Sequence, residues 1–329
     1  MVEAYRGGEP LAEVVRSRFV EGFHRGSAVV LGADGTVLTS IGDITAAVFP
    51  RSSNKPMQTV GALDSGLDLV DPADLAIASA SHRGEPFHVD RVRQLLTRFG
   101  LTADDLGCPA DLPYDDEART AVLASKAGPS RLHMNCSGKH AAMLAACVTA
   151  GWSTTDYLDP DHPLQRANRA AVERFIDEEI AATGVDGCGA PLFAFSLTAL
   201  ARVFQRFVDA EPGSRPRTVA DAMRARPDLV SGTTGTDTVL MRAVPGLLSK
   251  GGAEGVAAMA LPGVGAVAVK VDDGNQRATV PVAVAALRTL LSGVEHDAAA
   301  LAAVGHRAIV GGDGRGGSTE VGAVRPLWP

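Results

Sequence analysis

The stretch Ser27-Ala-Val-Val-Leu-Gly-Ala-Asp-Gly-Thr-Val-Leu-Thr-Ser40 places two short runs, rich in apolar and β-branched residues, on either side of Asp34-Gly35. An Asp-Gly pair between two such runs is a strong signal for a β-hairpin. A second hairpin is indicated late in the chain, where the apolar runs 256–261 and 266–271 flank Pro262-Gly-Val-Gly265. Each end of the chain is therefore expected to supply strands.

Helical patterns fill the middle of the chain. Asp71-Pro72 is a typical helix start, and Gly100 and Gly151 are typical helix ends. Helices are expected from residue 72 and over 86–99, 137–151, 163–183, 196–208, 218–226 and 277–291.

The order of these elements predicts the fold class. Strands and helices do not alternate along the chain, which argues against a doubly wound parallel sheet. We expect an α+β fold, in which an antiparallel sheet built from N- and C-terminal strands carries packed helices and a helical insertion. The sheet is expected from about 10–50 and 250–295, the insertion from about 70–250, and residues 1–329 as a single domain.

The composition is typical of a soluble globular protein. The 329 residues are 46% hydrophobic and 21% charged, with a formal net charge of −7. This acidic balance offers no basic footprint for nucleic acid, and no apolar run reaches the ~18 residues that a membrane span needs. Residues 1–9 lack the basic and apolar regions of a secretory signal, so we expect a cytoplasmic protein.

Four cysteines in a chain of this length do not form a disulfide framework. In a reducing compartment, a functional cysteine is a metal ligand or a nucleophile. Cys136, close to Lys139 and His140, begins an expected helix, and Cys188 lies in a Gly- and Pro-rich turn. Such a set could hold a soft metal such as zinc. The alternative is that the thiols are buried as small hydrophobic groups.

Lysine is rare in this chain. Of 31 basic residues only five are lysines, namely Lys55, Lys126, Lys139, Lys250 and Lys270. An amine can lose its proton whereas a guanidinium stays charged, so all of these lysines except Lys126 are candidates for proton transfer.

Ser52 and Lys55 form a Ser-x-x-Lys motif just before Pro56. Pro56 is tolerated only in the first turn of a helix, and a spacing of three residues brings the amine over the hydroxyl. A serine nucleophile needs an adjacent base, and a lysine of lowered pKa supplies one. The alternative is that the serines of this turn only cap the helix.

Two further segments carry polar groups suited to a small ligand. Ser81-His-Arg-Gly-Glu85 lies between two expected helices, where it either binds a small polar molecule or forms an ordinary capped turn. Lys270 ends an apolar strand, so its amine is expected in a polar pocket unless its stem reaches past the strand to solvent.

Six motifs follow one another along the chain. They are Arg-Ser-Ser-x-Lys-Pro-x-Gln at 51–58, Ser-His-x-Gly-Glu at 81–85, Asn-Cys-Ser-Gly-Lys-His at 135–140, Asp-Gly-Cys-Gly-Ala-Pro at 186–191, Ser-Lys-Gly-Gly-Ala-Glu-Gly at 249–255 and Lys-Val-Asp-Asp-Gly at 270–274. Together they resemble the asparaginase II family, the Rhizobium-type L-asparaginases. The segment 232–238 departs from the family pattern, because threonines stand where a basic residue is expected.

The resemblance implies one catalytic domain with a fold like that of serine β-lactamases and glutaminases. It implies hydrolysis of L-asparagine to L-aspartate and ammonia. Ser52 with Lys55 would be nucleophile and base, and Ser81 with Lys270 would be a supporting pair. Two lysines in one pocket would lower each other's pKa, which would leave one of them neutral.

The resemblance also implies a zinc ion held by Cys136, Lys139 and Cys188, with Asp186 nearby. This metal would orient the substrate or stabilise the pocket, since the protein itself supplies the nucleophile. A homodimer is likewise implied by the resemblance.

In the expected mechanism, Lys55 takes the Ser52 proton and Ser52 attacks the side-chain amide, while backbone N–H groups at the helix start hold the oxyanion. Ammonia leaves after protonation through Lys270 and Ser81, and water then resolves the acyl-enzyme. The expected substrate-binding residues are Arg51 for the α-carboxylate, Glu85 or Asp186 for the α-ammonium, and His140.

Two other functions remain open at this stage. A glutaminase or another Ser–Lys amide hydrolase would use the same groups, because one methylene changes discrimination by only ~1–3 kcal/mol. A non-catalytic sensor of small ligands on the same fold is the second alternative, although a sensor has no need for two Ser–Lys pairs.

Overall fold

The computed structural model describes residues 5–329. Residues 1–4, part of the segment considered above for a secretory signal, lie outside the described residues. The chain divides into two compact units: the first comprises Met1–Ser53, Phe195–Gln205 and Val239–Pro329, and the second comprises Asn54–Ala194 and Arg206–Thr238.

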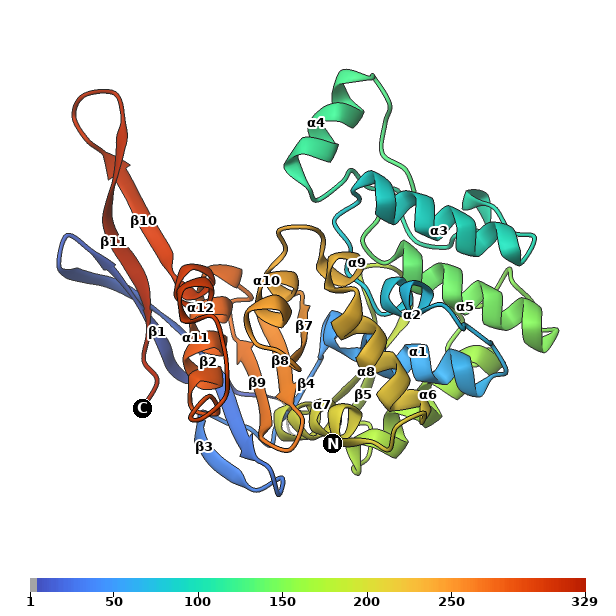
Figure 1. Ribbon diagram of the computed structural model, residues 1–329, viewed down its shortest axis with the longest axis horizontal. Helices are drawn as coiled ribbons and strands as arrows, with labels where there is room; N and C mark the ends of the chain where they lie inside the picture. The colour runs from blue at the N-terminus through green and yellow to red at the C-terminus, as the bar shows by residue number, and fades with distance from the viewer. Residues whose placement is uncertain (1–4) are drawn as a thin grey trace. The chain divides into compact units, whose positions relative to one another are not determined.

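The first unit contains a large antiparallel sheet. Its strands follow the order β10-β11-β1-β2-β9-β8-β7, and β3 also pairs with β2. Figure 1 shows the blue N-terminal strands beside the orange and red C-terminal ones. The strands are β1 (Glu9–Arg16), β2 (Phe19–Gly32), β3 (Val37–Ile41), β7 (Leu248–Gly252), β8 (Val256–Leu261), β9 (Gly265–Val271), β10 (Arg307–Gly312) and β11 (Ser318–Pro326).

The sheet forms because its central strands are apolar on both faces. In β9, residues 265–269 are all buried, as expected for a strand covered on both sides. The helix α11 (Gln276–Arg288) packs on this sheet and shares a hydrophobic core with β2, β8 and β9, and α12 (Ala298–Gly305) packs on α11. Gly265 has φ +153, and a Cβ there would lie 2.1 Å from the Leu31 carbonyl oxygen, so only glycine lets β9 approach β2 at this point.

The second unit is mainly helical. The helix α1 is buried along Lys55–Leu63 and contacts α5, α6 and α8, while α2 contacts α5 and α8. Its elements are α1 (Lys55–Asp64), α2 (Pro72–Ala78), α3 (Pro86–Arg98), η2 (Ala103–Asp105), α4 (Asp116–Ala124), α5 (Ser137–Ala150), α6 (Pro163–Ile176), β5 (Ala182–Val185), α8 (Arg215–Ala225) and α9 (Pro227–Ser231).

Five further elements complete the fold. The 3-10 turn η1 (Arg51–Asn54) directly precedes α1, and the strand β4 (Ala47–Val48) pairs with the end of β6 (Pro191–Ser196). The helices α7 (Leu197–Asp209) and α10 (Thr236–Ala243) each contribute residues to both units.

The predicted fold class is confirmed. The structure has an antiparallel sheet from both ends of the chain, with helices, and both predicted hairpins are present as β2–β3 and β8–β9. The predicted single-domain organisation stays a prediction.

Two details of the sequence prediction are wrong. The helix expected over 163–183 ends at Ile176, because Asp177 adopts a left-handed φ of 58° and the chain continues into β5. The strands β10 and β11 were not expected. The Gly-rich stretch 311–318 contains the turn between them, and the alternating exposure of β10 gives no long apolar run.

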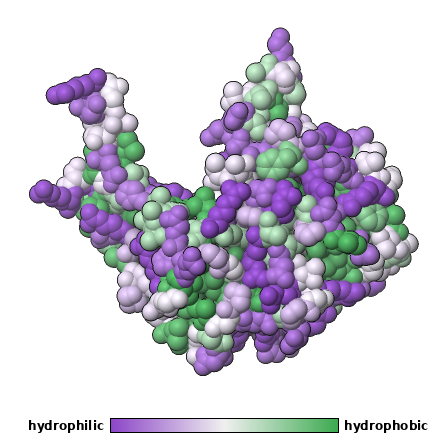
Figure 2. Space-filling model, viewed as in Figure 1, coloured by the Kyte–Doolittle hydropathy of each residue, from purple (hydrophilic) through white to green (hydrophobic). Residues whose placement is uncertain are grey.

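Within residues 5–329, no helix has both the length and the apolar character of a membrane span. Figure 2 shows a mostly hydrophilic surface with separate apolar patches on the visible face. Single exposed apolar side chains are ordinary on protein surfaces.

We predict that Leu287→Ala lowers the free energy of unfolding by about 2–5 kcal/mol, because Leu287 is fully buried in the core under α11 and truncation leaves a cavity. Leu38→Ala is the matched control, since Leu38 is 55% exposed on β3, and we expect a change within about 0.5 kcal/mol. Urea unfolding followed by circular dichroism measures both. Equal losses in the two variants would contradict this assignment of the core.

Candidate functional site

The turn that carries Ser52 is anchored by β7 of the first unit. Ser53 is fully buried and its Oγ donates a hydrogen bond to the Lys250 carbonyl oxygen at 2.8 Å. A Cβ at Gly252 would lie 2.6 Å from the Pro50 carbonyl oxygen, so this glycine lets the strand lie against the turn. Ser52 is half-buried in the same turn. The backbone therefore fixes the position from which Ser52 presents its hydroxyl.

Arg51 begins this turn in an unusual conformation. Its φ is +50°, in the left-handed region that non-glycine residues rarely adopt. Its Nη1 lies 3.6 Å from Glu254 Oε1. Residues held in such conformations cluster at functional sites.

Lys55, at the start of α1, is buried in the second unit. Only 1% of its surface is exposed. Its Nζ donates hydrogen bonds to Ser81 Oγ at 3.0 Å and to the Ala80 carbonyl oxygen. The structure thus brings two of the four predicted catalytic residues into direct contact, in a pairing that the motif spacing did not indicate.

The loop that carries Ser81 is held by a buried histidine. His82 Nδ1 accepts a hydrogen bond from the Gly84 N–H at 3.1 Å, so its Nε2 carries the proton and donates to Ser137 Oγ at 2.8 Å. The Ser137 hydroxyl in turn donates to the Leu132 carbonyl oxygen at 3.0 Å. Burial lowers the pKa of His82 well below its ordinary value, and the nearby His88, Lys55 and His133 lower it further. A neutral imidazole therefore fits this network.

Lys270 lies near the end of β9 in the first unit and is half-buried. Its Nζ donates to the Val271 carbonyl oxygen. Burial lowers the pKa of Lys270, Arg51 lowers it further, and the carboxylates of Asp272 and Glu254 oppose the shift. The shift has the direction that a lysine needs to exchange protons near neutral pH.

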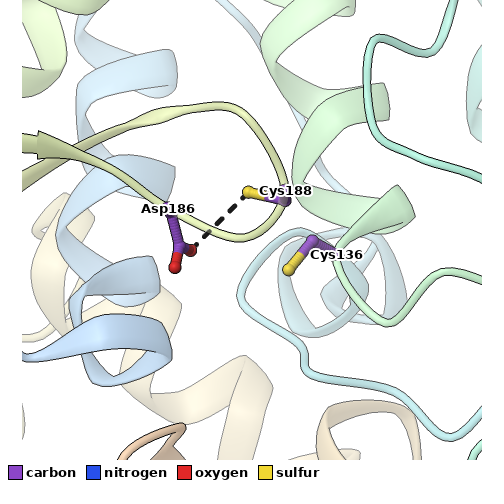
Figure 3. Close-up of side chains that lie close together, drawn as sticks. All are labelled: Cys136, Asp186 and Cys188. Carbon is purple, nitrogen blue, oxygen red and sulfur yellow. Dashed lines mark hydrogen bonds between the residues drawn. The ribbon is translucent and has the colours of Figure 1, made fainter.

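Two cysteines and an aspartate lie together in the second unit. Figure 3 shows Asp186 and Cys188 on the turn between β5 and β6, and Cys136 at the start of α5. One donor atom from each lies within 4.8 Å of the other two. Cys188 Sγ is 3.6 Å from Asp186 Oδ2, and Lys139 Nζ donates to Cys188 Sγ at 3.0 Å.

The charges of this cluster are interdependent. A hydrogen bond from the Cys136 thiol lowers the pKa of Cys188, and Lys139 lowers it further, whereas the same bond and burial raise the pKa of Cys136. Burial lowers the pKa of Lys139, but the charges of Cys188, Cys136 and Asp186 outweigh burial and raise it. These directions favour the charged form of Lys139 and the thiolate form of Cys188.

These donors fit a zinc ion. Tetrahedral Zn²⁺ with two sulfur ligands at 2.3 Å needs sulfurs about 3.8 Å apart, and the donor atoms here lie within 4.8 Å of one another. Cys136 and Cys188 would be thiolate ligands. The third ligand would be Lys139 after loss of its proton, or the Asp186 carboxylate, which the sequence prediction assigned to the substrate.

His140 lies on α5 and is fully buried. Its Nδ1 is 2.6 Å from the Tyr157 hydroxyl, and burial lowers its pKa while Cys188 opposes the shift. Its predicted contact with substrate stays a prediction. Sequence reasoning missed Tyr157, because nothing in the loop 152–162 signals a partner for a residue on α5.

Glu85 forms hydrogen bonds with the segment 232–238, which departs from the family pattern. Its carboxylate accepts hydrogen bonds from Thr233 N at 2.9 Å and from Thr233 Oγ1 at 2.6 Å. A Cβ at Gly232 would lie 2.6 Å from Glu85 Oε1, and φ there is +84°. The threonine thus has a structural partner in this chain, and a direct role of Glu85 in substrate binding stays a prediction.

Residues 12–326 match the family model described as L-asparaginase II. The chain belongs to the L-asparaginase II family. Since the match covers nearly the whole chain, the resemblance inferred from the six motifs is confirmed. Family membership indicates an amide hydrolase.

Several solved structures match this family member at low sequence identity. One is described as Mglu in its native form, with 14% identity, a TM-score of 0.44, and coverage of 83% of this chain and 65% of that chain. Another is a β-lactamase from Mycobacterium bovis, with 16% identity, a TM-score of 0.37, and coverage of 81% of this chain and 93% of that chain. No curated protein sequence matches the chain.

We predict that Cys136→Ala and Cys188→Ala each abolish stoichiometric zinc binding, because each removes a sulfur ligand. Cys147→Ala is the matched control, since Cys147 is an equally buried free thiol on α5 outside the cluster. Zinc content after dialysis against one equivalent of Zn²⁺ is measured by plasma mass spectrometry. Equal zinc content in all three variants would rule out this donor set.

We predict that acid destabilises the protein partly through His82. The unfolded chain takes up a proton near pH 6.5, whereas the folded His82 does so only at much lower pH. Stability should therefore fall as pH drops below about 6.5, by up to about 1.4 kcal/mol per pH unit from this group.

His82→Gln should flatten this decline between pH 7 and 5 without removing it, because His88 and His140 also have lowered pKa values. Thermal unfolding at several pH values measures the slope. The exposed His306 provides the control, and His306→Gln should leave the slope unchanged. An unchanged slope in His82→Gln would contradict a neutral buried His82.

Proposed function

We propose that this protein hydrolyses the side-chain amide of L-asparagine to L-aspartate and ammonia. In this proposal Ser52 is the nucleophile, Lys55 its base, and an acyl-enzyme the intermediate that water resolves. The family match supports amide hydrolysis, and the residues of the motifs support this division of roles.

The observation that carries the proposal is the environment of the Lys55 amine. A neutral amine has two N–H groups and one lone pair. The Ala80 carbonyl oxygen and Ser81 Oγ are acceptors for two N–H bonds of Lys55. In its neutral form, Lys55 would therefore have its lone pair available for a proton from a serine hydroxyl, which is what a general base requires.

The choice between the two serines of the turn rests on their hydrogen bonds. Ser53 is fully buried, and its Oγ donates a hydrogen bond to the Lys250 carbonyl oxygen. Ser52 is half-buried and precedes Lys55 by one helical turn. Ser52 is therefore the better nucleophile, and Ser53 serves to anchor the turn.

Lys270 and Ser81 are proposed to carry the proton that the leaving ammonia needs. The lowered pKa of Lys270 supports proton exchange at this residue. A zinc ion bound to Cys136 and Cys188 would supply a positive charge that orients substrate polar groups. The chemical steps themselves use only the serine and lysine side chains.

We predict that Ser52→Ala lowers ammonia release from L-asparagine by at least about a thousandfold, as expected when a nucleophile is removed. Release is measured with a coupled glutamate dehydrogenase assay, in parallel with L-glutamine as substrate. Turnover of L-asparagine alone supports the proposed specificity, whereas faster turnover of L-glutamine would make the protein a glutaminase.

Ser53→Ala is the matched control from the same turn. It removes one hydrogen bond and should lower turnover by no more than about tenfold. Retained activity in Ser52→Ala would move the nucleophile to Ser81. Binding of L-asparagine without turnover by the wild type would favour a sensor instead.

A further inference from the structure

Glu254 faces Arg51 across a short turn of the first unit. Glu254 Oε1 lies 3.6 Å from Arg51 Nη1, and the Glu254 side chain is 65% exposed while that of Arg51 is 21% exposed. Glu254 has φ +57° and Arg51 has φ +50°, so both partners adopt the left-handed conformation. The pair therefore consists of two opposite charges that the backbone holds in a fixed place.

Stability does not explain this arrangement. An exposed ion pair at this distance contributes little, and a left-handed φ is unfavourable for arginine and glutamate. Conformations of this kind persist where the surrounding structure enforces them, and they cluster at functional sites. The pair is thus a candidate for binding rather than for folding.

Two glycines lie close to the pair. A Cβ at Gly274 would lie 2.6 Å from Glu254 Oε2, and a Cβ at Gly252 would lie 3.3 Å from Arg51 Cβ. A larger residue at position 274 would displace the Glu254 carboxylate, and one at position 252 would clash with the backbone of Pro50, next to Arg51. The half-buried Lys270 is close enough for both charges to influence it.

We propose that Glu254 binds the α-ammonium group of the substrate while Arg51 binds its α-carboxylate. This inference rests on the proposed function and deepens it, because it assigns the residue that recognises an α-amino acid. A zwitterion carries its two charges side by side. It can therefore lie against the Arg51–Glu254 pair with each of its charges beside the opposite one.

The other two carboxylates considered for this role are engaged elsewhere. Glu85 accepts two hydrogen bonds from Thr233, and Asp186 lies in the donor cluster with Cys136 and Cys188. Glu254, by contrast, lies beside Arg51. The substrate class that follows is an α-amino acid with a free ammonium group, rather than any primary amide.

The test compares ligands that differ only in the α-amino group. L-aspartate and succinate are titrated calorimetrically into the wild type and into Glu254→Gln. The wild type should prefer L-aspartate, and Glu254→Gln should weaken L-aspartate binding about tenfold to hundredfold, as for loss of a charge-assisted hydrogen bond. Succinate binding should not change. Kinetically, the same variant should raise KM for L-asparagine and leave turnover of succinamic acid unaltered.

Glu21→Gln is the matched control. Glu21 pairs with Arg16 at 2.9 Å on the surface of the same unit, so this variant loses a similar ion pair and should bind both ligands like the wild type. Equal weakening of both ligands in Glu254→Gln, or no weakening, would overturn the proposal, as would a wild type that binds neither ligand. Absence of ammonia release from L-asparagine by the wild type would instead refute the proposed function, and the titration would still decide the role of Glu254.

Discussion

The antiparallel pairing of β2 with β9 is the interaction on which the first unit depends. It runs from Gly26↔Val271 to Gly32↔Gly265 and joins the N-terminal strands to the C-terminal ones. The register sets Ser27 opposite Lys270. A shift by one residue would turn Lys270 to the other face of the sheet, where Val269 and Val271 are buried in the core. Burial of the core thus also fixes the direction in which this lysine points.

The few lysines of this chain lie mostly in buried positions with defined hydrogen-bond acceptors. Lys55 and Lys250 are each 1% exposed and Lys139 is 3% exposed, while Lys270 is half-buried and Lys126 is exposed in a turn. Each of the four that are not exposed donates a hydrogen bond to a defined acceptor. Since burying an amine is unfavourable without such partners, these positions require a compact donor that arginine could not replace.

Much of the fold could be predicted from local sequence. The Asp34-Gly35 turn and the apolar runs correctly predicted both hairpins. The end of α5 at Gly151 was also predicted correctly. The strands β10 and β11 could not be found in this way. The residues of β10 alternate in exposure before a Gly-rich turn, and the pairing of β11 with β1 joins segments about 300 residues apart in the chain.

The candidate site, too, could be predicted from the sequence only in part. The motifs identified which residues carry chemistry, since Ser52, Lys55 and Cys136 each stand in a distinctive pattern. They did not indicate neighbours that are distant in sequence. The partners of Glu254 and His82 depend on how turns and loops fold back, and periodicity carries no information about such contacts.

The discontinuity of the first unit has a consequence for how the chain is made. The stretch Asn54–Ala194 supplies most of the second unit and emerges from the ribosome without interruption. The strand β2, by contrast, must wait for β9, which is more than 200 residues later in the chain. Long-range pairing of this kind is slow, because the chain loses the entropy of closing a long loop before it gains the contacts that compensate for this loss. The helical unit can therefore fold during synthesis. The strand β2 can pair early with its neighbours β1 and β3, but the edge that faces β9 stays unpaired and needs protection from aggregation until β9 has been made.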